Sequence, residues 1–189
     1  MTSQDAPIDD PIRPDGRQAK SVVLVLTGDG KGKSSSAFGT AVRGLARGWK
    51  IAVIQFLKSG EWRVGEEAVL TKLGADWFAL GDGFTWESKD LDESAAIAQR
   101  AWAFAAEQIR AGEHHIVLLD EITYAINYGW IDGDEVAAVI RDRPEHVYVV
   151  ATGRDAPQVL IDVADTVSEV RNVKHAYDKG IMARRGFDY

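Results

Sequence analysis

Hydrophobic residues from Ser21 onward alternate between short continuous runs and longer stretches whose apolar positions lie three or four residues apart. A continuous aliphatic run is typical of a strand that is buried on both faces, as in a parallel sheet. Spacings of three and four residues are typical of a helix with one buried face. The runs predict strands at residues 22–26, 51–57, 77–80, 115–119, 147–151 and 166–170. We therefore expect an α/β domain with a mostly parallel sheet of about six strands flanked by helices.

Helices are predicted between most of these strands. The apolar positions from Ala37 to Leu45 follow helical spacing, and Gly48 is the expected stop. Asp92 can cap a long alanine-rich helix that runs to about Arg110 and ends at Gly112. The prediction is completed by two short helices, at about 121–128 and 133–142, and by a last helix that opens at Pro157.

The domain organisation follows from length and composition. The chain has 189 residues, which is typical of one domain. Residues 1–20 contain three of the five prolines and many charged residues, with too little apolar surface to offset the entropy of ordering. We expect a flexible N-terminal arm at 1–20 and a single domain at 21–189. The arm is either a leader without a role or a segment that orders over a ligand.

Charge and residue usage exclude several classes of function. Acidic residues number 29 against 22 basic ones, and the net charge of −7 argues against a protein that coats nucleic acid or an anionic membrane. The absence of cysteine excludes disulfides, thiolate metal sites and a cysteine nucleophile. No signal peptide is visible, and no apolar run approaches the roughly 18 residues of a membrane-spanning helix. We expect a cytoplasmic protein with no nucleic-acid or membrane partner.

A glycine-rich segment with two lysines joins the first predicted strand to the first predicted helix. Glycines let successive backbone N–H groups turn toward phosphate oxygens, and the N-terminus of the helix adds partial positive charge. Lys33 brings a full charge to a polyphosphate, and the hydroxyl of Ser34 suits Mg²⁺. The residues expected to bind the nucleotide here are Gly28, Asp29, Gly30, Lys31, Gly32, Lys33, Ser34 and Ser35.

The match to the phosphate-loop pattern G-x-x-x-x-G-K-[ST] is imperfect. Counting back from Lys33, the first glycine should stand at position 27, where the sequence has Thr27, and Gly28 comes one place late. The alternative is a tight glycine-rich turn whose two lysines are only solvated. The buried strand before the loop and the helix after it favour polyphosphate binding.

Charged residues follow two other predicted strands. Asp120 and Glu121 end the strand at 115–119, and Arg154 follows the end of the strand at 147–151. The C-terminal ends of parallel strands share one edge of a sheet, so Asp120 is expected near Ser34 and Arg154 is expected to face the site. Ser34, Asp120 and Glu121 are therefore the candidate metal ligands, although Glu121 could equally hold a ribose hydroxyl or nothing. The adjacent histidines His114 and His115 are expected to form a solvated edge.

Four segments in order along the chain resemble the ATP:corrinoid adenosyltransferases of the P-loop type. The family is known for a shortened glycine loop, and Ser34 stands where its members more often have threonine. The resemblance covers nearly all of residues 21–189 and implies a P-loop NTPase (RecA-like) fold. Its segments are Thr27–Gly39, Gly83–Glu87, Leu119–Tyr124 and the C-terminal run from Thr152 to Tyr189.

The resemblance implies transfer of the 5′-deoxyadenosyl group of ATP to the Co(I) of a corrinoid, with release of triphosphate. The corrinoid is cobalamin or cobyrinic acid a,c-diamide, and the product belongs to adenosylcobalamin biosynthesis or salvage. The same resemblance implies ATP as co-substrate with Mg²⁺ (or Mn²⁺), a homodimer, and a flavin or flavodoxin-type reductant. Because Co(I) is itself the nucleophile, no side chain has to be activated for attack.

The resemblance also implies catalytic roles for Lys33, Phe84, Trp86 and Glu121. Phe84 and Trp86 match aromatic residues that help to displace the lower axial ligand of the corrinoid, which makes Co(II) easier to reduce. The alternative for these two residues is packing against the core, because large apolar side chains are costly to expose in a loop.

Three rival functions share the phosphate loop. A small-molecule kinase or ATPase would cleave the terminal phosphate of ATP, a nucleotide switch would only bind it, and a corrinoid carrier would use it as an effector. The sequence has no Asn-Lys-x-Asp motif, which disfavours a GTPase.

Overall fold

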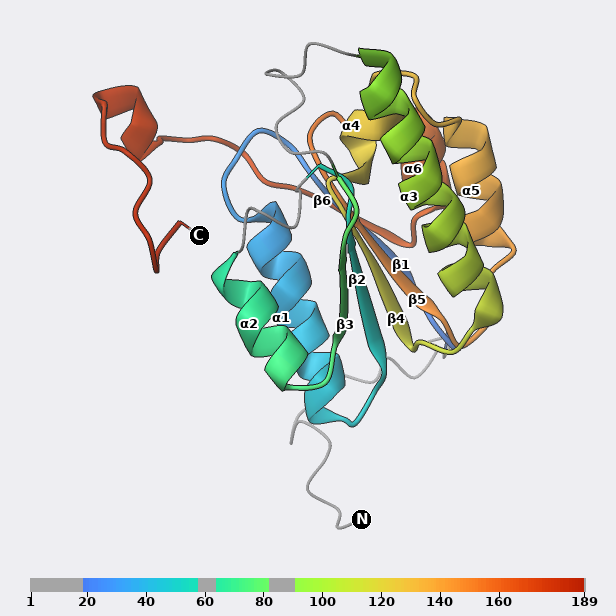
Figure 1. Ribbon diagram of the computed structural model, residues 1–189. Helices are drawn as coiled ribbons and strands as arrows, with labels where there is room; N and C mark the ends of the chain where they lie inside the picture. The colour runs from blue at the N-terminus through green and yellow to red at the C-terminus, as the bar shows by residue number, and fades with distance from the viewer. Residues whose placement is uncertain (1–18, 58–63, 82–90, 189) are drawn as a thin grey trace, which may run out of the picture.

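The structure is a computed structural model that describes residues 19–57, 64–81 and 91–188. Six strands form a single parallel sheet in the order β3-β2-β4-β5-β1-β6 (Figure 1). The predicted α/β architecture with a sheet of about six strands is confirmed, and it is consistent with a P-loop NTPase-like fold. The strands are β1 (Val23–Thr27), β2 (Ile51–Gln55), β3 (Asp76–Ala79), β4 (Ile116–Asp120), β5 (Tyr148–Thr152) and β6 (Thr166–Glu169).

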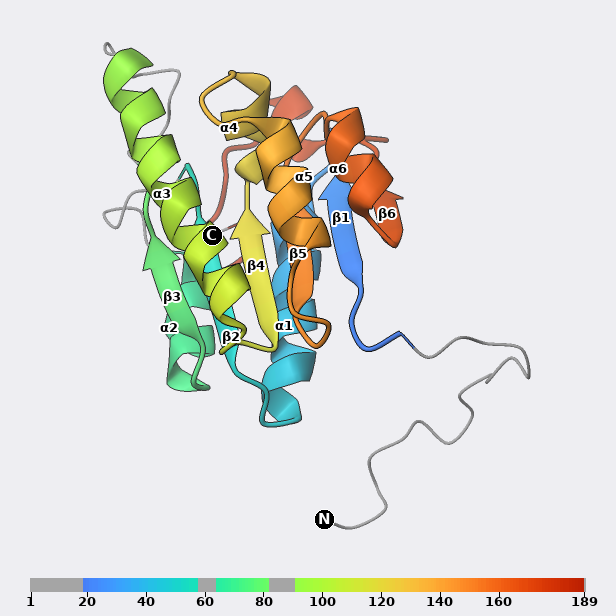
Figure 2. The same ribbon diagram turned by 90° about the vertical axis from the view of Figure 1, so that its right-hand side faces the viewer.

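Helices cover both faces of the sheet. One face carries α1 and α2, and the other carries α3, α4, α5 and α6 (Figures 1 and 2). All five residues of β4 are buried because both of its faces are covered, which explains its continuous apolar run. The helices are α1 (Lys33–Ala46), α2 (Gly65–Lys72), α3 (Leu91–Ala111), α4 (Ile122–Asn127), α5 (Gly133–Arg141) and α6 (Gln158–Val163).

Alternate residues of the central strands enter two separate cores. On the face of α3 and α5, Val25 and Leu119 pack into a cluster with the fully buried Ile109 of α3. On the face of α1, Leu118 packs with the buried Phe38 of α1. Each large apolar side chain removed from water in this way stabilises the fold by roughly 1.5–3 kcal/mol.

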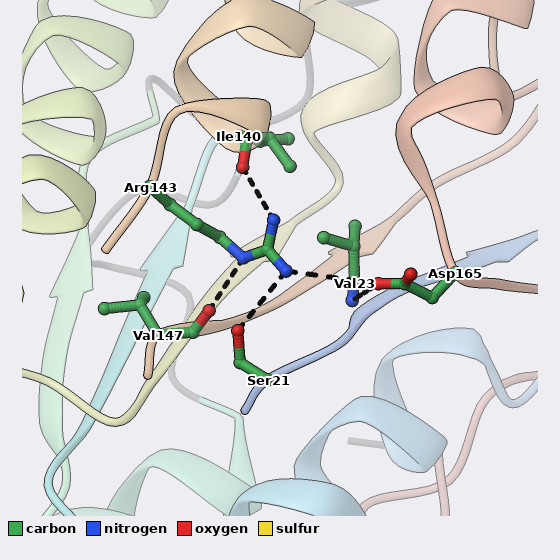
Figure 3. A network of polar contacts seen from close by, with 6 residues as sticks. All are labelled: Ser21, Val23, Ile140, Arg143, Val147 and Asp165. Carbon is green, nitrogen blue, oxygen red and sulfur yellow. Dashed lines mark hydrogen bonds and ion pairs between the residues drawn. The ribbon is translucent and has the colours of Figure 1, made fainter. Parts of the chain in front are cut away.

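Arg143 ties together the ends of three elements at the edge of the sheet opposite the strand C-termini (Figure 3). Its guanidinium donates to the carbonyls of Ile140 at 2.9 Å and Val147 at 2.8 Å, and lies 4.0 Å from the carboxylate of Asp165. Asp165 in turn accepts the backbone N–H of Val23 at 2.7 Å. The start of β1 is therefore fixed to the segments that precede β5 and β6.

Several element boundaries differ from the prediction. Helix α2 was not predicted, because Leu70 is its one buried residue and eight residues with a single buried position show little periodicity. Asp92 was expected to cap α3, but the helix begins at Leu91, so Asp92 lies in its first turn, where a carboxylate still favours the helix dipole. Gly112 (φ 65°) and Gly48 (φ 73°) follow α3 and α1 as predicted stops.

His114 was expected at a solvated edge, and this prediction is wrong. Its side chain is buried, and its Nε2 lies 2.9 Å from the carboxylate of Asp76 at the start of β3. Its neighbour His115 stacks on Trp49 with ring centroids 5.7 Å apart and accepts the backbone N–H of Lys50 at 3.1 Å. Contacts with distant segments therefore decide the burial of this pair.

The chain after β6 leaves the sheet and passes beyond α1 (Figure 1). It contains a short 3₁₀-helix at Ala176–Lys179, which was not predicted. Residues 1–18 lie outside the described residues, so the predicted arm and its boundary stay predictions. Among the helices that the structure describes, none has the length and apolar character needed to cross a membrane.

Candidate nucleotide site

A cavity of about 480 Å³ opens where β1, β4 and β5 end. Parallel strands bring their C-terminal ends to one edge, so the residues that follow these three strands meet there. The predicted residues that line it are Asp29, Gly30, Lys31, Gly32, Lys33, Ser34, Ser35, Glu121 and Arg154. The residues predicted from three separate segments are therefore brought together, with two exceptions, Gly28 and Asp120.

The N-terminus of α1 faces this cavity. Gly32 is the N-cap of the helix and has a φ of 124°, which residues with a side chain rarely adopt. The backbone conformation alone favours glycine here, because a Cβ would meet no atom within 4 Å. The first helical hydrogen bond of this end runs from the N–H of Ser36 to the carbonyl of Gly32 at 2.9 Å. The N–H groups of Lys33, Ser34 and Ser35 therefore lack helical acceptors and can bind an anion.

Gly28 and Gly30 serve close packing against the chain that follows β6. The N–H of Gly30 donates to the carbonyl of Val170 at 2.7 Å. A Cβ on Gly28 would lie 2.5 Å from that oxygen, and a Cβ on Gly30 would lie 2.7 Å from it. Gly28 does not line the cavity, and this crossing of two chain segments is the reason that position 28 requires a glycine.

Lys33 is held inside the loop that it belongs to. Its Nζ donates to the carbonyl of Gly30 at 2.9 Å. Partial burial lowers the pKa of the Lys33 ammonium, and the nearby guanidinium of Arg154 lowers it further, while Glu121 among other carboxylates opposes the shift. Lys33 and Arg154 therefore bring two positive charges into one cavity, which costs free energy when no ligand is bound. A bound polyphosphate would offset that cost.

Asp120 lies beneath the cavity and does not line it. The side chain is fully buried, with one carboxylate oxygen accepting from the Nε2 of Gln55 at 2.9 Å and the other from the Oγ1 of Thr152 at 2.9 Å. Glu121 follows with a left-handed backbone (φ 64°) and lines the cavity. The two acidic residues therefore have different surroundings, and the charge of Asp120 reaches the site through its effect on Lys33.

Comparison with known proteins adds a family to this geometry. The family described as ATP:corrinoid adenosyltransferase BtuR/CobO/CobP matches residues 19–189. The chain belongs to the ATP:corrinoid adenosyltransferase family. The resemblance of its motifs to that family is therefore confirmed over the whole of the described fold.

Corrinoid adenosyltransferases of three bacteria are similar to the chain along most of their length. The Pseudomonas aeruginosa protein is 40% identical, covering 100% of this chain and 93% of its own. The Escherichia coli protein is 38% identical over 90% of this chain and 86% of its own. The protein from a Sinorhizobium species is 41% identical over 90% of this chain and 81% of its own. The adenosyltransferase match thus includes both the loop and the C-terminal segment.

Residues of the C-terminal segment form a wall of the adenosyltransferase cavity that sequence reasoning did not assign. The carboxylate of Asp188 lies 2.8 Å from the Nζ of Lys31, and this hydrogen bond is the main cause that lowers the pKa of Asp188. The signal available in the sequence was the polar run near the C-terminus. Of its lining residues, only His175 was considered from the sequence, as a basic residue for the phosphates of ATP or the corrinoid, with plain surface as the alternative. The lining residues from this segment are Asn172, His175, Tyr177, Asp178 and Asp188.

Tyr124 is a further lining residue that sequence reasoning did not single out. It lies in the first turn of α4, and burial raises the pKa of its hydroxyl, with Arg154 opposing and Glu121 adding to the rise. The hydroxyl stays protonated at neutral pH and can donate a hydrogen bond to a ligand oxygen. Its position in the short helix predicted at about 121–128 gave no separate sign of this role.

The described oxygen donors fit a magnesium ion that is shared with a nucleotide. The described part of the chain has no group of three or more histidine, aspartate or glutamate residues placed to hold a metal. Ser34 and Glu121 do line the same cavity and supply the hard oxygen atoms that Mg²⁺ prefers. Mg²⁺ is commonly held by one or two protein oxygens together with phosphates and water, so this donor set suits it.

Phe84 and Trp86 lie outside the described residues, as does Glu87. Their predicted role near the corrinoid therefore stays a prediction. Gly81, the last described residue before them, follows β3 at the same edge of the sheet as the phosphate loop.

Proposed function

We propose that the protein transfers the 5′-deoxyadenosyl group of ATP to the Co(I) of a corrinoid and that the cavity described above holds the triphosphate. Family membership supports the reaction. The position of Lys33 at a helix N-terminus that no side chain caps supports the place of the triphosphate. The corrinoid is cobalamin or an earlier precursor such as cobyrinic acid a,c-diamide.

The reaction makes one bond and breaks one. The electron pair of Co(I) forms the bond to the C5′ carbon of ATP, while the pair of the C5′–O bond leaves with triphosphate. Negative charge therefore accumulates on the leaving oxygen in the transition state, and preorganised donors aimed at that oxygen accelerate the step. The attacking atom comes with the corrinoid, so the protein needs no nucleophilic side chain.

Lys33, the amides of the first turn of α1 and Arg154 are the groups that we assign to the leaving triphosphate. The amides and Lys33 come from one rigid helix end, and Arg154 approaches from the turn after β5. Holding the triphosphate rigidly also aligns C5′ with the approaching cobalt, which lowers the entropy lost in the transition state.

We assign Ser34 and Glu121 to Mg²⁺, with Asp120 as the buried carboxylate behind them. Bound there, Mg²⁺ would supply positive charge that offsets the charge of the triphosphate. The earlier prediction of Asp120 as a direct ligand has less support than that of Glu121, because both of its oxygens accept protein hydrogen bonds.

Other parts of the proposal rest on the family resemblance and the sequence. They are the wedge formed by Phe84 and Trp86, the flavin or flavodoxin-type reductant, the homodimer and the cytoplasmic location. The alternative, a small-molecule kinase or ATPase, gains no support from the family or from the similar proteins.

An anaerobic assay with ATP, Mg²⁺ and chemically reduced cobalamin tests the proposed function. We expect the absorption spectrum to change to that of an alkylcobalt product, and we expect the change to require both ATP and protein. A Lys33→Ala variant serves as the matched protein control. If ATP binds but none of the corrinoids supplied as Co(I) yields an alkylcobalt product, the proposal is refuted.

A further inference from the structure

The turns that follow β4 and β5 are fastened to each other by two threonine hydroxyls. Thr152, the last residue of β5, accepts the backbone N–H of Glu121 at 2.9 Å. Thr123, in the first turn of α4, donates to the backbone carbonyl of Arg154 at 2.7 Å. Each threonine lies two residues from the cavity residue of its own turn and bonds the cavity residue of the other turn. The two turns therefore cannot shift independently.

Both threonines are fully buried, whereas Glu121 and Arg154 extend into the cavity. The hydroxyl proton of Thr152 is directed to the carboxylate of Asp120 at 2.9 Å, which leaves its lone pair for the N–H of Glu121. A buried hydroxyl whose partner is removed pays a desolvation cost, so these bonds resist opening. The orientation of each hydroxyl is thereby fixed.

The backbone of both turns depends on these bonds. Glu121 and Asp155 adopt positive φ values of 64° and 48°, which cost free energy for residues other than glycine and persist when surrounding contacts enforce them. Gly153 lies against Thr123, where a Cβ would come 1.9 Å from the Oγ1 of Thr123. The amide of Asn127 adds a bond to the carbonyl of Asp155 at 3.0 Å. The turn after β5 is thus held against the first turns of α4.

We infer that Thr123 and Thr152 are positioning residues, which set the backbone from which Arg154 and Glu121 reach the leaving triphosphate and its metal. The inference rests on the proposed function. A donor preorganised for the transition state must be held closely, and a displacement of about 1 Å can cost roughly 100-fold in rate. Neither threonine lines the cavity, so each acts through the residue that it holds.

Thr123→Val tests this inference, because it removes the hydroxyl and keeps the volume. We expect kcat/KM for adenosyl transfer to fall by about 10- to 100-fold, and Thr123→Ser to recover most of it, since serine keeps the donor. Thr40→Val is the matched control. Its hydroxyl donates to the carbonyl of Ser36 at 3.2 Å on α1, away from the cavity, and we expect near-normal activity.

A double-mutant cycle separates positioning from a general structural effect. In an Arg154→Ala background, Thr123→Val should cause little further loss in kcat/KM, because the group that it positions is gone. The same fold-loss in both backgrounds, or a Thr123→Val protein with normal kcat/KM, would overturn the inference. Thermal unfolding of each full-length variant shows whether the variants are folded.

Asn127→Ala provides a second variant if Thr123→Val does not fold. Asn127 is exposed and holds the same turn from the surface, so its loss should also lower kcat/KM in the wild-type background and not in Arg154→Ala. ATP affinity is the second readout of both cycles. A wild-type protein that forms no alkylcobalt product counts against the proposed function. If Thr123→Val lowers ATP affinity by the same factor with and without Arg154→Ala, that result counts against the inference alone.

Discussion

The Nζ of Lys33 donates a hydrogen bond of 2.9 Å to the carbonyl of Gly30. The loop thereby holds its own cation at the N-terminus of α1 before any nucleotide is bound. A lysine side chain that is already ordered loses less conformational entropy on binding than a solvated one. The same bond places the ammonium beside the helix amides, so the charge and the donors form one anion site.

Replacement of Lys33 by alanine should lower kcat/KM for adenosyl transfer by about 100-fold or more, because each preorganised donor to a developing charge is worth that amount. The fold should persist, since the side chain is only partly buried. Lys31→Ala is the matched control, because Lys31 is exposed and paired with Asp188, and its loss should be smaller. Equal losses in the two variants would remove the special role of Lys33.

The pH dependence of ATP affinity should report Lys33. Burial and Arg154 lower the pKa of its ammonium, so the charge is lost as pH rises through a value below the ordinary lysine value of about 10.4. ATP should therefore bind more weakly at the alkaline end of a titration from about pH 7 to about pH 10. The raised pKa of Tyr124 places its ionisation beyond the alkaline end of this titration.

Lys33→Arg identifies the group responsible for that alkaline loss. Arginine keeps its charge throughout this range, so the variant should bind ATP with an affinity that stays flat where that of the wild-type protein falls. Calorimetric titrations at each pH give the two curves. An alkaline decline that is unchanged in Lys33→Arg would assign it to another group.

Gly28→Ala should destabilise the protein more than Gly48→Ala. Both glycines have positive φ, which costs an alanine roughly 1–2 kcal/mol. Only at Gly28 would the new Cβ also meet a carbonyl, that of Val170 at 2.5 Å, whereas nothing lies within 4 Å at Gly48. Urea denaturation measures both free energies of unfolding, and equal losses would contradict the account of the loop glycines.

Gln55→Leu should destabilise the protein by about 1–3 kcal/mol, because it removes a hydrogen-bond donor from a fully buried carboxylate. Gln55 donates to Asp120 at 2.9 Å and accepts from the Nε1 of Trp77 at 3.2 Å. Trp77→Phe removes only the second bond and should cost less. Urea denaturation of both variants gives the comparison, and a Gln55→Leu protein as stable as the wild type would show that Asp120 does not need this bond.

Trp86→Ala should mainly impair turnover that starts from Co(II). The predicted wedge excludes water and the axial base from cobalt, which matters for reduction and not for the later transfer from Co(I). Parallel assays with a reducing partner and with chemically prepared Co(I) measure the two cases. Similar losses in both assays would defeat the wedge hypothesis.

Local pattern was enough to predict the loop, the helix after it and the cavity position of Arg154. Each depends on a strand, a turn and the rule that parallel strands end at one edge. The burial of Asp120 beneath the cavity could not be predicted, because it depends on hydrogen bonds to Gln55 and Thr152 from two neighbouring strands.

Long-range contacts also decided the wall of the cavity, and weak periodicity hid one helix of the fold. The Lys31–Asp188 pair joins segments more than 150 residues apart, and no local signal encodes it. Helix α2 was not predicted, because its single buried residue, Leu70, gives almost no helical periodicity of apolar positions.

Phosphorus NMR of the products shows which bond of ATP the protein breaks. The protein is incubated without oxygen with ATP, Mg²⁺ and a corrinoid supplied as Co(I), and the phosphorus products are compared with the alkylcobalt formed. We expect inorganic triphosphate in equal amount to adenosylcorrinoid, because the bond broken is C5′–O. ADP and orthophosphate as the main products, formed without alkylcobalt, would contradict it.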